Sequence, residues 1–279
     1  MRNRVIVAGA FDDLRSRQIR FLQEAANLVE LTVLLWSDET LHDSKKAPPQ
    51  FPLEERKYVL EALRFGGSVK VVPPVDDAHR LPDLAGLEPR IWAVPQAQHS
   101  PLQEAFCQQR GLEYRVLWDE MLRGFPEASS GGSWVGGNAP SSSRKKVLVT
   151  GCYDWFHSGH VRFFEEVSAY GDVYVVVGRD ANIRLLKGAG HPLYPQDERR
   201  YMVQSIRFVK QALISTGQGW LDAEPEIERL QPNIYAVNED GDRPEKRDYC
   251  QRHGIQYLVL QRTPAQGLPK RSSTDLRGF

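Results

Sequence analysis

The chain has 279 residues, and its 36 basic and 36 acidic side chains cancel to a formal net charge of zero. A neutral chain gives no electrostatic reason to expect binding to nucleic acid or to a membrane surface. The longest apolar runs are too short to span a bilayer, and the start lacks the apolar stretch of a signal peptide. The three cysteines show no CxxC spacing, so we expect a reduced, cytoplasmic protein without membrane insertion.

The first predicted elements are four apolar segments that we expect to be buried strands. They are "RVIVAG" (4–9), "LTVLLW" (31–36), "VKVV" (69–72) and "RIWAV" (90–94). A stretch dominated by Gly, Ser, Pro and Ala follows, without apolar periodicity, which is typical of a flexible linker. We therefore expect a first domain over residues 1–123 and a linker over 124–145.

The two sides of this linker are copies of each other. "ERKYV" (55–59) recurs as "ERRYM" (198–202), and "IWAV" (91–94) recurs as "IYAV" (234–237), both at an offset of 143. Near the start the offset is 142, where "GAFDDLRSRQIRFLQE" (9–24) matches "GCYDWFHSGHVRFFEE" (151–166). So many matches at nearly one offset indicate an internal duplication, whose second domain covers 146–279.

Strands and helices alternate through the second copy. Strands are expected near 146–150, 172–177, 210–214, 233–237 and 256–260, and helices near 158–169, 196–207, 222–230 and 244–253. This alternation predicts an α/β fold in which each copy forms a Rossmann-like, doubly wound parallel sheet. Such sheets bind ligands beyond the carboxyl ends of the strands, which is where "HSGH" (157–160) falls.

His157, Gly159 and His160 stand at the predicted start of a helix, and three interpretations compete for them. They could be structural histidines with satisfied hydrogen bonds, or they could share a zinc ion, although no Cys, third His or HExxH pattern stands nearby. A phosphate site is the third interpretation, because helix N-termini favour anions and imidazoles can donate to phosphate oxygens. The first copy has Arg15, Arg17 and Gln18 here, so we expect chemistry only in the second copy.

The stretch resembles the HxGH signature of the nucleotidylyltransferase superfamily, specifically its cytidylyltransferase-like group. "GDVYVVVGRDANIRLLKGAGHPLYPQDER" is similar to that family's second strand, its lysine loop and its following helix. "RT" (262–263) and "RSSTDLR" (271–277) are similar to its closing segment, with a longer spacing between the two parts. The resemblance runs through residues 146 to 279.

The resemblance implies roles for individual residues. His157 and His160 would contact the α-phosphate of a nucleoside triphosphate, and Lys187 would bring a cation to the same phosphates. Arg199 would offer a fork to phosphate, and Asp154 would fix the turn or the acceptor substrate. The remaining residues implied in nucleotide binding are Gly151, Cys152, Tyr153, Gly159, Ser272, Ser273 and Thr274. Catalysis would then be positioning and charge neutralisation, with Mg²⁺ on the triphosphate and no protein metal site.

The resemblance implies a cytidylyltransferase that joins CMP from CTP to a small phosphorylated alcohol or sugar and releases pyrophosphate. Phosphoethanolamine and glycerol phosphate are acceptors of related enzymes. Two alternatives stay open: an ATP-dependent adenylyltransferase acting on a sugar phosphate, and a non-catalytic nucleotide sensor. For related single-copy enzymes the resemblance implies a homodimer, so we also expect the two copies to pack together as an internal pseudo-dimer.

Overall fold

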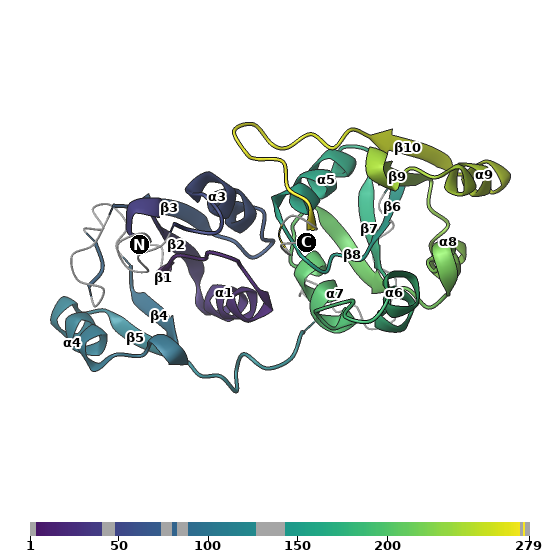
Figure 1. The fold of residues 1–279 in the computed structure, drawn as a ribbon. Helices are drawn as coiled ribbons and strands as arrows, with labels where there is room; N and C mark the ends of the chain where they lie inside the picture. Colours follow the sequence, from purple (N-terminus) through teal and green to yellow (C-terminus); the bar gives the residue numbers. More distant parts are fainter. Residues whose placement is uncertain are drawn as a thin grey trace. The chain divides into compact units, whose positions relative to one another are not determined.

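The computed structural model describes residues 4–40, 48–73, 80–82, 89–126, 143–273 and 276. The chain forms two compact units, Met1–Gly124 and Phe125–Phe279, and each contains one five-stranded, all-parallel sheet (Figure 1). The predicted tandem pair of Rossmann-like sheets is therefore confirmed. The pseudo-dimer stays a prediction, and residues 127–142 of the predicted linker lie outside the described residues.

The first unit is built around the sheet β3-β2-β1-β4-β5. Its strands are β1 (Arg4–Gly9), β2 (Glu30–Trp36), β3 (Ser68–Val72), β4 (Ile91–Pro95) and β5 (Glu113–Leu117). Its helices are α1 (Ser16–Leu28), α3 (Leu53–Glu61) and α4 (Pro101–Arg110), with a 3-10 turn η1 (Gln96–Gln98). Ile6, Leu34 and Trp92 are buried in one core cluster with Cys107 of α4, as expected for strands covered by helices.

The second unit repeats this plan in the sheet β10-β9-β6-β7-β8. Its strands are β6 (Lys146–Gly151), β7 (Asp172–Val177), β8 (Val209–Ile214), β9 (Ile234–Asn238) and β10 (Gln256–Leu260). Its helices are α5 (Ser158–Ser168), α6 (Asp180–Lys187), α7 (Gln196–Gln204), α8 (Glu224–Leu230) and α9 (Pro244–Arg252), with 3-10 turns η2 (Gly219–Leu221) and η3 (Glu239–Gly241). Figure 1 shows α5 and α7 on one face of the sheet and α8 and α9 on the other.

Apolar side chains explain why these segments pack as they do. Val147, Leu148 and Val149 of β6 are all fully buried, because helices cover both faces of the strand. Helix α5 buries Val161, Phe164 and Val167, which recur at the spacing of one helix face. The strong periodicity of these segments is why the sequence predicted them well.

Strand β6 lies at the point where the order of the second sheet reverses. It pairs with β7 from Lys146–Asp172 to Gly151–Val177, whereas its pairing with β9 joins only Val147 to Ile234 and Leu148 to Tyr235. Beyond that point the carboxyl ends of β6 and β9 are no longer joined by the strand ladder. A reversal of this kind is where parallel α/β sheets bind ligands.

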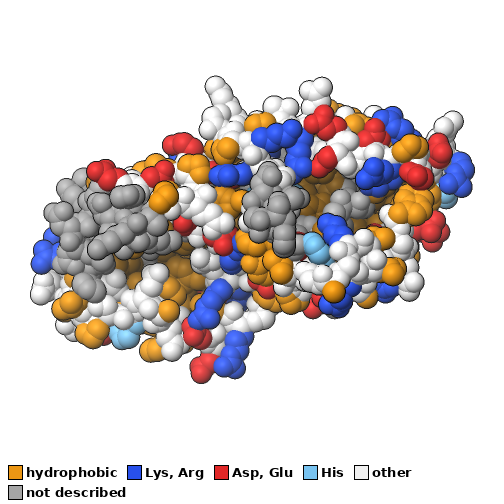
Figure 2. Space-filling view, viewed as in Figure 1, with side chains coloured by type: hydrophobic (Ala, Val, Ile, Leu, Met, Phe, Trp, Pro, Cys, Tyr) orange, Lys and Arg blue, Asp and Glu red, His pale blue; other side chains and the backbone are white. Residues whose placement is uncertain are grey.

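Charged side chains of both signs occur on the face drawn in Figure 2. Figure 2 shows acidic and basic side chains interspersed over the visible face, as the zero net charge leads one to expect. Within the described ranges, no helix combines the length and the apolar character needed to cross a membrane.

Candidate active site

The first histidine of the HxGH motif begins helix α5. His157 is the N-cap residue, and only 2% of it is exposed. Its Nδ1 accepts a hydrogen bond from the backbone N–H of Gly159 at 3.1 Å. Because Nδ1 accepts, the proton of the neutral ring sits on Nε2. His157 therefore presents one N–H donor from Nε2 at the positive end of the helix.

Gly159 is required by the imidazole of His157. A Cβ at this position would lie 2.9 Å from Cε1 and 3.0 Å from Nδ1 of the ring, closer than ordinary van der Waals contact. Any side chain would push the ring out of place. The glycine thus keeps His157 oriented, a role additional to the close approach of a nucleotide that we expected.

His160 lies in a stack of rings above the start of α5. Its ring centroid is 4.0 Å from that of His157 and 5.5 Å from that of Phe156, with both pairs stacked. Its Nδ1 is buried and has no hydrogen-bond partner among the described residues. Burial, followed by the nearby His157, Arg262 and Lys187, lowers the pKa of His160 well below 6.5. His160 is therefore neutral at pH 7 and acts as a hydrogen-bonding group, not as a cation.

Tyr153 packs against the His160 ring of this stack. Its backbone is left-handed (φ 54°), and its ring meets His160 edge-on at 5.2 Å between centroids. A Cβ at Gly151 would lie 2.7 Å from the Tyr153 ring, so the strand must end in glycine. Burial raises the pKa of Tyr153, which stays a phenol. Tyr153 is only 6% exposed, and its ring also lies 5.4 Å from that of Phe164, so it packs between the histidine and the core of the unit.

Lys187 is the last residue of helix α6, an element that the sequence analysis missed. The lysine was expected in a loop, but the loop begins only at Gly188 (φ 86°). Helix α6 is fixed to η2 by Asn182, whose side chain bonds the backbone of Gly219 in both directions at 2.8 and 3.0 Å. The exposed Lys187 lowers the pKa of His160 and opposes the raising effect of burial on the pKa of Cys152. The positive charge of Lys187 therefore favours a lower pKa for a group at the end of β6, the Cys152 thiol.

Asp154 fixes the loop that leads into α7. Its carboxylate accepts hydrogen bonds from the backbone N–H of Leu193 at 2.8 and 3.0 Å and of Tyr194 at 3.0 Å. The first unit repeats this arrangement, because Asp12 accepts from the backbone N–H of Gln50 and Phe51 at 3.1 and 2.9 Å. The geometry fits the turn-fixing role, and contact of Asp154 with the acceptor stays a prediction.

Arg199 is only 1% exposed, and its guanidinium is occupied by the protein itself. It donates to the backbone carbonyls of Tyr194 (2.9 Å), Cys152 (2.6 Å) and Gly178 (2.7 Å), and to Asp180 (2.7 Å). The fork expected to bind phosphate thus joins the ends of β6 and β7 to the start of α6 and the loop before α7. Contact with a nucleotide stays a prediction that this bonding pattern does not favour.

Arg56 of the first unit repeats these bonds. It donates to the backbone carbonyls of Phe51 (3.0 Å) and Ala10 (2.6 Å) and to Asp38 (2.6 Å). A copy that has lost the histidines thus keeps this arginine network, which points to a structural role for it.

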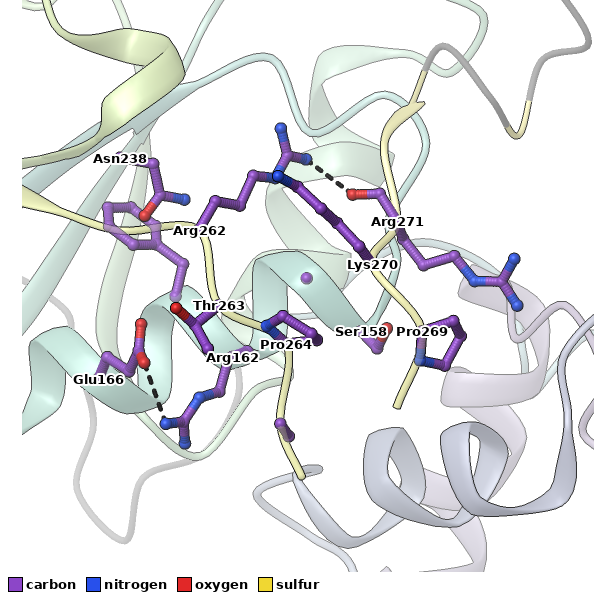
Figure 3. Close-up of a pocket in the computed structure, with 13 residues that line it drawn as sticks. Ser158, Arg162, Glu166, Asn238, Arg262, Thr263, Pro264, Pro269, Lys270 and Arg271 are labelled. Atoms are coloured by element: carbon purple, nitrogen blue, oxygen red, sulfur yellow. Dashed lines mark hydrogen bonds and ion pairs between the residues drawn. The ribbon is translucent and has the colours of Figure 1, made fainter. Parts of the chain in front are cut away.

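The closing segment of the chain lies against the HxGH motif. The Ser273 hydroxyl donates to the backbone carbonyl of Trp155 at 3.4 Å, and Arg262 donates to the carbonyl of Arg271 at 3.0 Å. Figure 3 shows Arg262 and Arg271 across from Ser158 at the start of α5. Ser272 starts the last helical turn, since its carbonyl accepts from Leu276 N at 3.3 Å. Thr274 lies outside the described residues.

Two residues that the sequence analysis did not select also belong to this site. Arg262 bonds Asp240 at 2.6 Å and contributes to the lowered pKa of His160. Asn238 ends β9 at the point where the strand order reverses, and its side-chain oxygen is buried without a partner among the described residues. Both line a narrow pocket of about 10 Å³ between α5 and residues 262–271 (Figure 3). The sequence held a signal for each: Arg262 is the arginine of the "RT" pair, and Asn238 directly follows the predicted fourth strand.

The arrangement suits an anion that gains charge during a reaction. Neutral imidazoles supply N–H donors, and the start of α5 adds the positive end of the helix dipole. Lys187 and Arg262 place two cationic side chains close enough to influence His160. Such preorganised donors stabilise the charge that develops on phosphoryl oxygens in a transition state.

The chain is similar to several known proteins over its second half. The cytidylyltransferase-like family model matches residues 148–278. An FAD synthase of Ferroglobus placidus is 32% identical over 120 residues, which is 42% of this chain and 75% of that protein. An FAD synthase of Aciduliprofundum boonei is 32% identical over 136 residues, 48% of this chain and 84% of that protein. The bifunctional protein HldE of Aliarcobacter butzleri is 38% identical over 72 residues, 25% of this chain and 15% of that protein.

Proposed function

The chain belongs to the cytidylyltransferase-like family of nucleotidyltransferases through its second half, and on that premise we propose that it transfers AMP from ATP to a small phosphorylated acceptor. A phosphate oxygen of the acceptor attacks the α-phosphorus of ATP and forms the new P–O bond. The bond from the α-phosphorus to the bridging oxygen breaks, and pyrophosphate leaves. The stacked, neutral pair His157 and His160 at the start of α5 is the observation that carries this proposal.

Relatives favour ATP over the CTP that we expected from the sequence. Two FAD synthases match at 32% identity, and the FAD that they make contains an adenosine monophosphate unit. The family model is named after cytidylyl transfer, whereas these relatives are named for the synthesis of an adenine dinucleotide. Adenylyl transfer, the alternative in our sequence analysis, is therefore the better-supported reaction.

The residues have distinct parts in the proposed reaction. His157 and His160 donate hydrogen bonds to non-bridging oxygens of the α-phosphate, and Lys187 and Arg262 neutralise charge on the phosphates. Positioning and charge neutralisation are sufficient, because the nucleophile is the phosphate of the acceptor itself. Among the described residues no group of three His, Cys, Asp or Glu side chains could hold a metal. A magnesium ion bound with the triphosphate would supply further charge neutralisation.

Pyrophosphate release tests the proposal directly. The full chain is incubated with Mg²⁺, either ATP or CTP, and one acceptor from phosphoethanolamine, glycerol 3-phosphate, a sugar 1-phosphate and flavin mononucleotide. We expect acceptor-dependent release with ATP, and a variant lacking His160 provides the background rate. Release with CTP alone would contradict adenylyl transfer, and no release with any pair would favour a nucleotide sensor.

A further inference from the structure

The first unit contains a cavity at the same place in its fold as the candidate active site in the second. The cavity has a volume of about 360 Å³ and lies over the carboxyl ends of β1, β2 and β4. Phe11, Phe21, Trp36 and Leu122 give it apolar walls, and Gln18 and Gln98 add amide groups. A volume of roughly 300–1,000 Å³ with apolar walls and a few polar groups is typical of small-molecule sites.

A second cavity of about 310 Å³ adjoins the first. Ala8, Trp36, Ala97 and Gln98 line both cavities, so the indole of Trp36 stands between them. His99 and Gln103 add polar groups to the second cavity. Trp36 thus contributes aromatic surface to both cavities, on which a flat ligand can stack.

Substitutions between the copies change this place from an anion site into an aromatic one. Trp36 stands where the second copy has Gly178, at the end of the second strand, and Gln18 stands where it has His160. Asp119 replaces Arg262 at the offset of 143, which exchanges a cation for an anion. The donors and the charge that would hold a triphosphate are therefore removed, and a ring surface is added.

The arginines of the first copy each pair with an acid, so together these pairs add no net positive charge to this place. Arg15, in the place of His157, pairs with Asp13 at 2.6 Å, and Arg17, in the place of Gly159, pairs with Asp119. The second copy has Trp155 where Asp13 stands, so this acid belongs to the first copy alone. Of these four side chains Arg17 lines the cavity, and Asp12 also lines it, so the wall carries one basic and one acidic side chain and has no excess of positive charge for a polyanion.

We propose that the first unit binds an uncharged nucleoside in this cavity, with the base stacked on Trp36. Trp36 provides the stacking surface that nucleobases use on proteins. The Oε1 atom of Gln18 accepts from the backbone N–H of Arg15 at 2.7 Å, which leaves its amide N–H groups to donate to the base. Gln98 is exposed and lines the cavity, so its side-chain carbonyl and amino group can face a base edge. The site does not depend on the reaction in the second unit.

Calorimetric titration of the full chain tests this site. Adenosine and cytidine are titrated in the presence of a saturating, non-hydrolysable ATP analogue, which occupies the second unit. We expect one nucleoside site per chain under these conditions. No binding of either nucleoside, binding that the analogue abolishes, or equal affinity of the first unit for triphosphate would overturn the proposal.

Variants locate the bound nucleoside. Trp36→Gly introduces the residue of the second copy and is expected to weaken binding by about 5- to 150-fold, the effect of losing one base–aromatic stack. Trp36→Phe keeps a ring and should retain most of the affinity, while Ala97→Phe fills the space and should block binding without removing a core side chain. Trp220→Ala, which removes an exposed indole of the second unit, is the matched control and should bind normally. Binding unchanged in both Trp36→Gly and Ala97→Phe would contradict the proposed location.

Discussion

At the scale of single residues, the candidate site depends on imidazoles that are kept neutral. His160 touches His157, Phe156 and Tyr153 through its ring and has a buried Nδ1 without a partner among the described residues. A buried donor or acceptor left without a partner is costly, and such groups often serve a ligand. The ring is thus prepared for a hydrogen bond that a phosphate oxygen would complete.

Replacing His160 should remove that bond and leave the fold intact. We expect His160→Ala to lower kcat by about 10²- to 10³-fold, as the loss of one preorganised donor does. Gln18→Ala is the matched control, because Gln18 holds the same position in the first copy, and it should leave turnover unchanged. Steady-state rates and circular dichroism decide the matter. An active His160→Ala variant would remove this residue from the mechanism.

The lowered pKa of His160 also predicts how stability depends on pH. Between that lowered pKa and 6.5 the unfolded chain binds more protons than the folded one. The contribution of His160 to the free energy of unfolding is therefore largest above about pH 6.5, and it decreases as the pH falls below that value. Urea unfolding at pH 7 and pH 5.5 should show a larger loss for the wild type than for His160→Gln. His253→Gln, at an exposed histidine, should behave like the wild type, and equal losses in all three would contradict the prediction.

At the scale of elements, the buried arginine networks connect strand ends to the helices that follow. Arg199 and Arg56 join equivalent segments in the two units, and each donates to backbone carbonyls that sequence gives no means of identifying. A sequence shows that an arginine is present, but a carbonyl partner has no sequence signature. The phosphate role predicted for Arg199 came from the family resemblance, which carries no information on these carbonyl partners.

Removing Arg199 should destabilise the second unit before it affects nucleotide affinity. Breaking a buried, charged network by removing one partner costs about 3–5 kcal/mol. We expect Arg199→Ala to lower the unfolding free energy by this order, and Arg56→Ala to do the same in the first unit. Denaturant titration measures the free energy of unfolding, and the KM for the triphosphate tests the alternative that Arg199 binds the nucleotide. A raised KM with an unchanged free energy of unfolding would contradict this prediction and would show that Arg199 binds the nucleotide.

Helix α6 shows where prediction from periodicity ends. Strands 172–177 and 256–260 were predicted with their observed bounds. Apolar, β-branched runs between polar segments favour a strand, and the polar segments mark where it begins and ends. Helix α6 has only eight residues, and Leu185 and Leu186 are 70% and 54% exposed, so it lacks a clear buried face. Its position depends on Asn182 and the backbone of Gly219, a contact 37 residues apart in the chain. Such long-range bonds are not visible in a local pattern.

At the scale of the whole molecule, the two units share a framework but differ in the charges at their switch points. The second unit has Arg262 and two imidazoles there, whereas the first has Asp119, paired with Arg17, and Gln18. The duplicated sheet and the order of its strands were predictable from the repeated motifs. The charge pairs were not, because Arg17 and Asp119 lie 102 residues apart.

The chain should therefore hold one nucleoside triphosphate. Calorimetric titration with a non-hydrolysable ATP analogue is expected to give one site per chain, located in the second unit. The double variant His157→Ala/His160→Ala should lose most of this binding enthalpy, and Arg15→Ala should not. A stoichiometry of two would show that the first copy still binds triphosphate in spite of Asp13 and Asp119.

The equivalent carboxylates Asp154 and Asp12 give each unit its own reporter of local opening. Each accepts hydrogen bonds from two consecutive backbone amides, at Leu193 and Tyr194 in one unit and at Gln50 and Phe51 in the other. The hydrogens of these amides can exchange with deuterated solvent only when the loop releases its carboxylate. The exchange rates of these two pairs of amides would thus report local opening of the second and first units separately, within one chain and without any bound ligand.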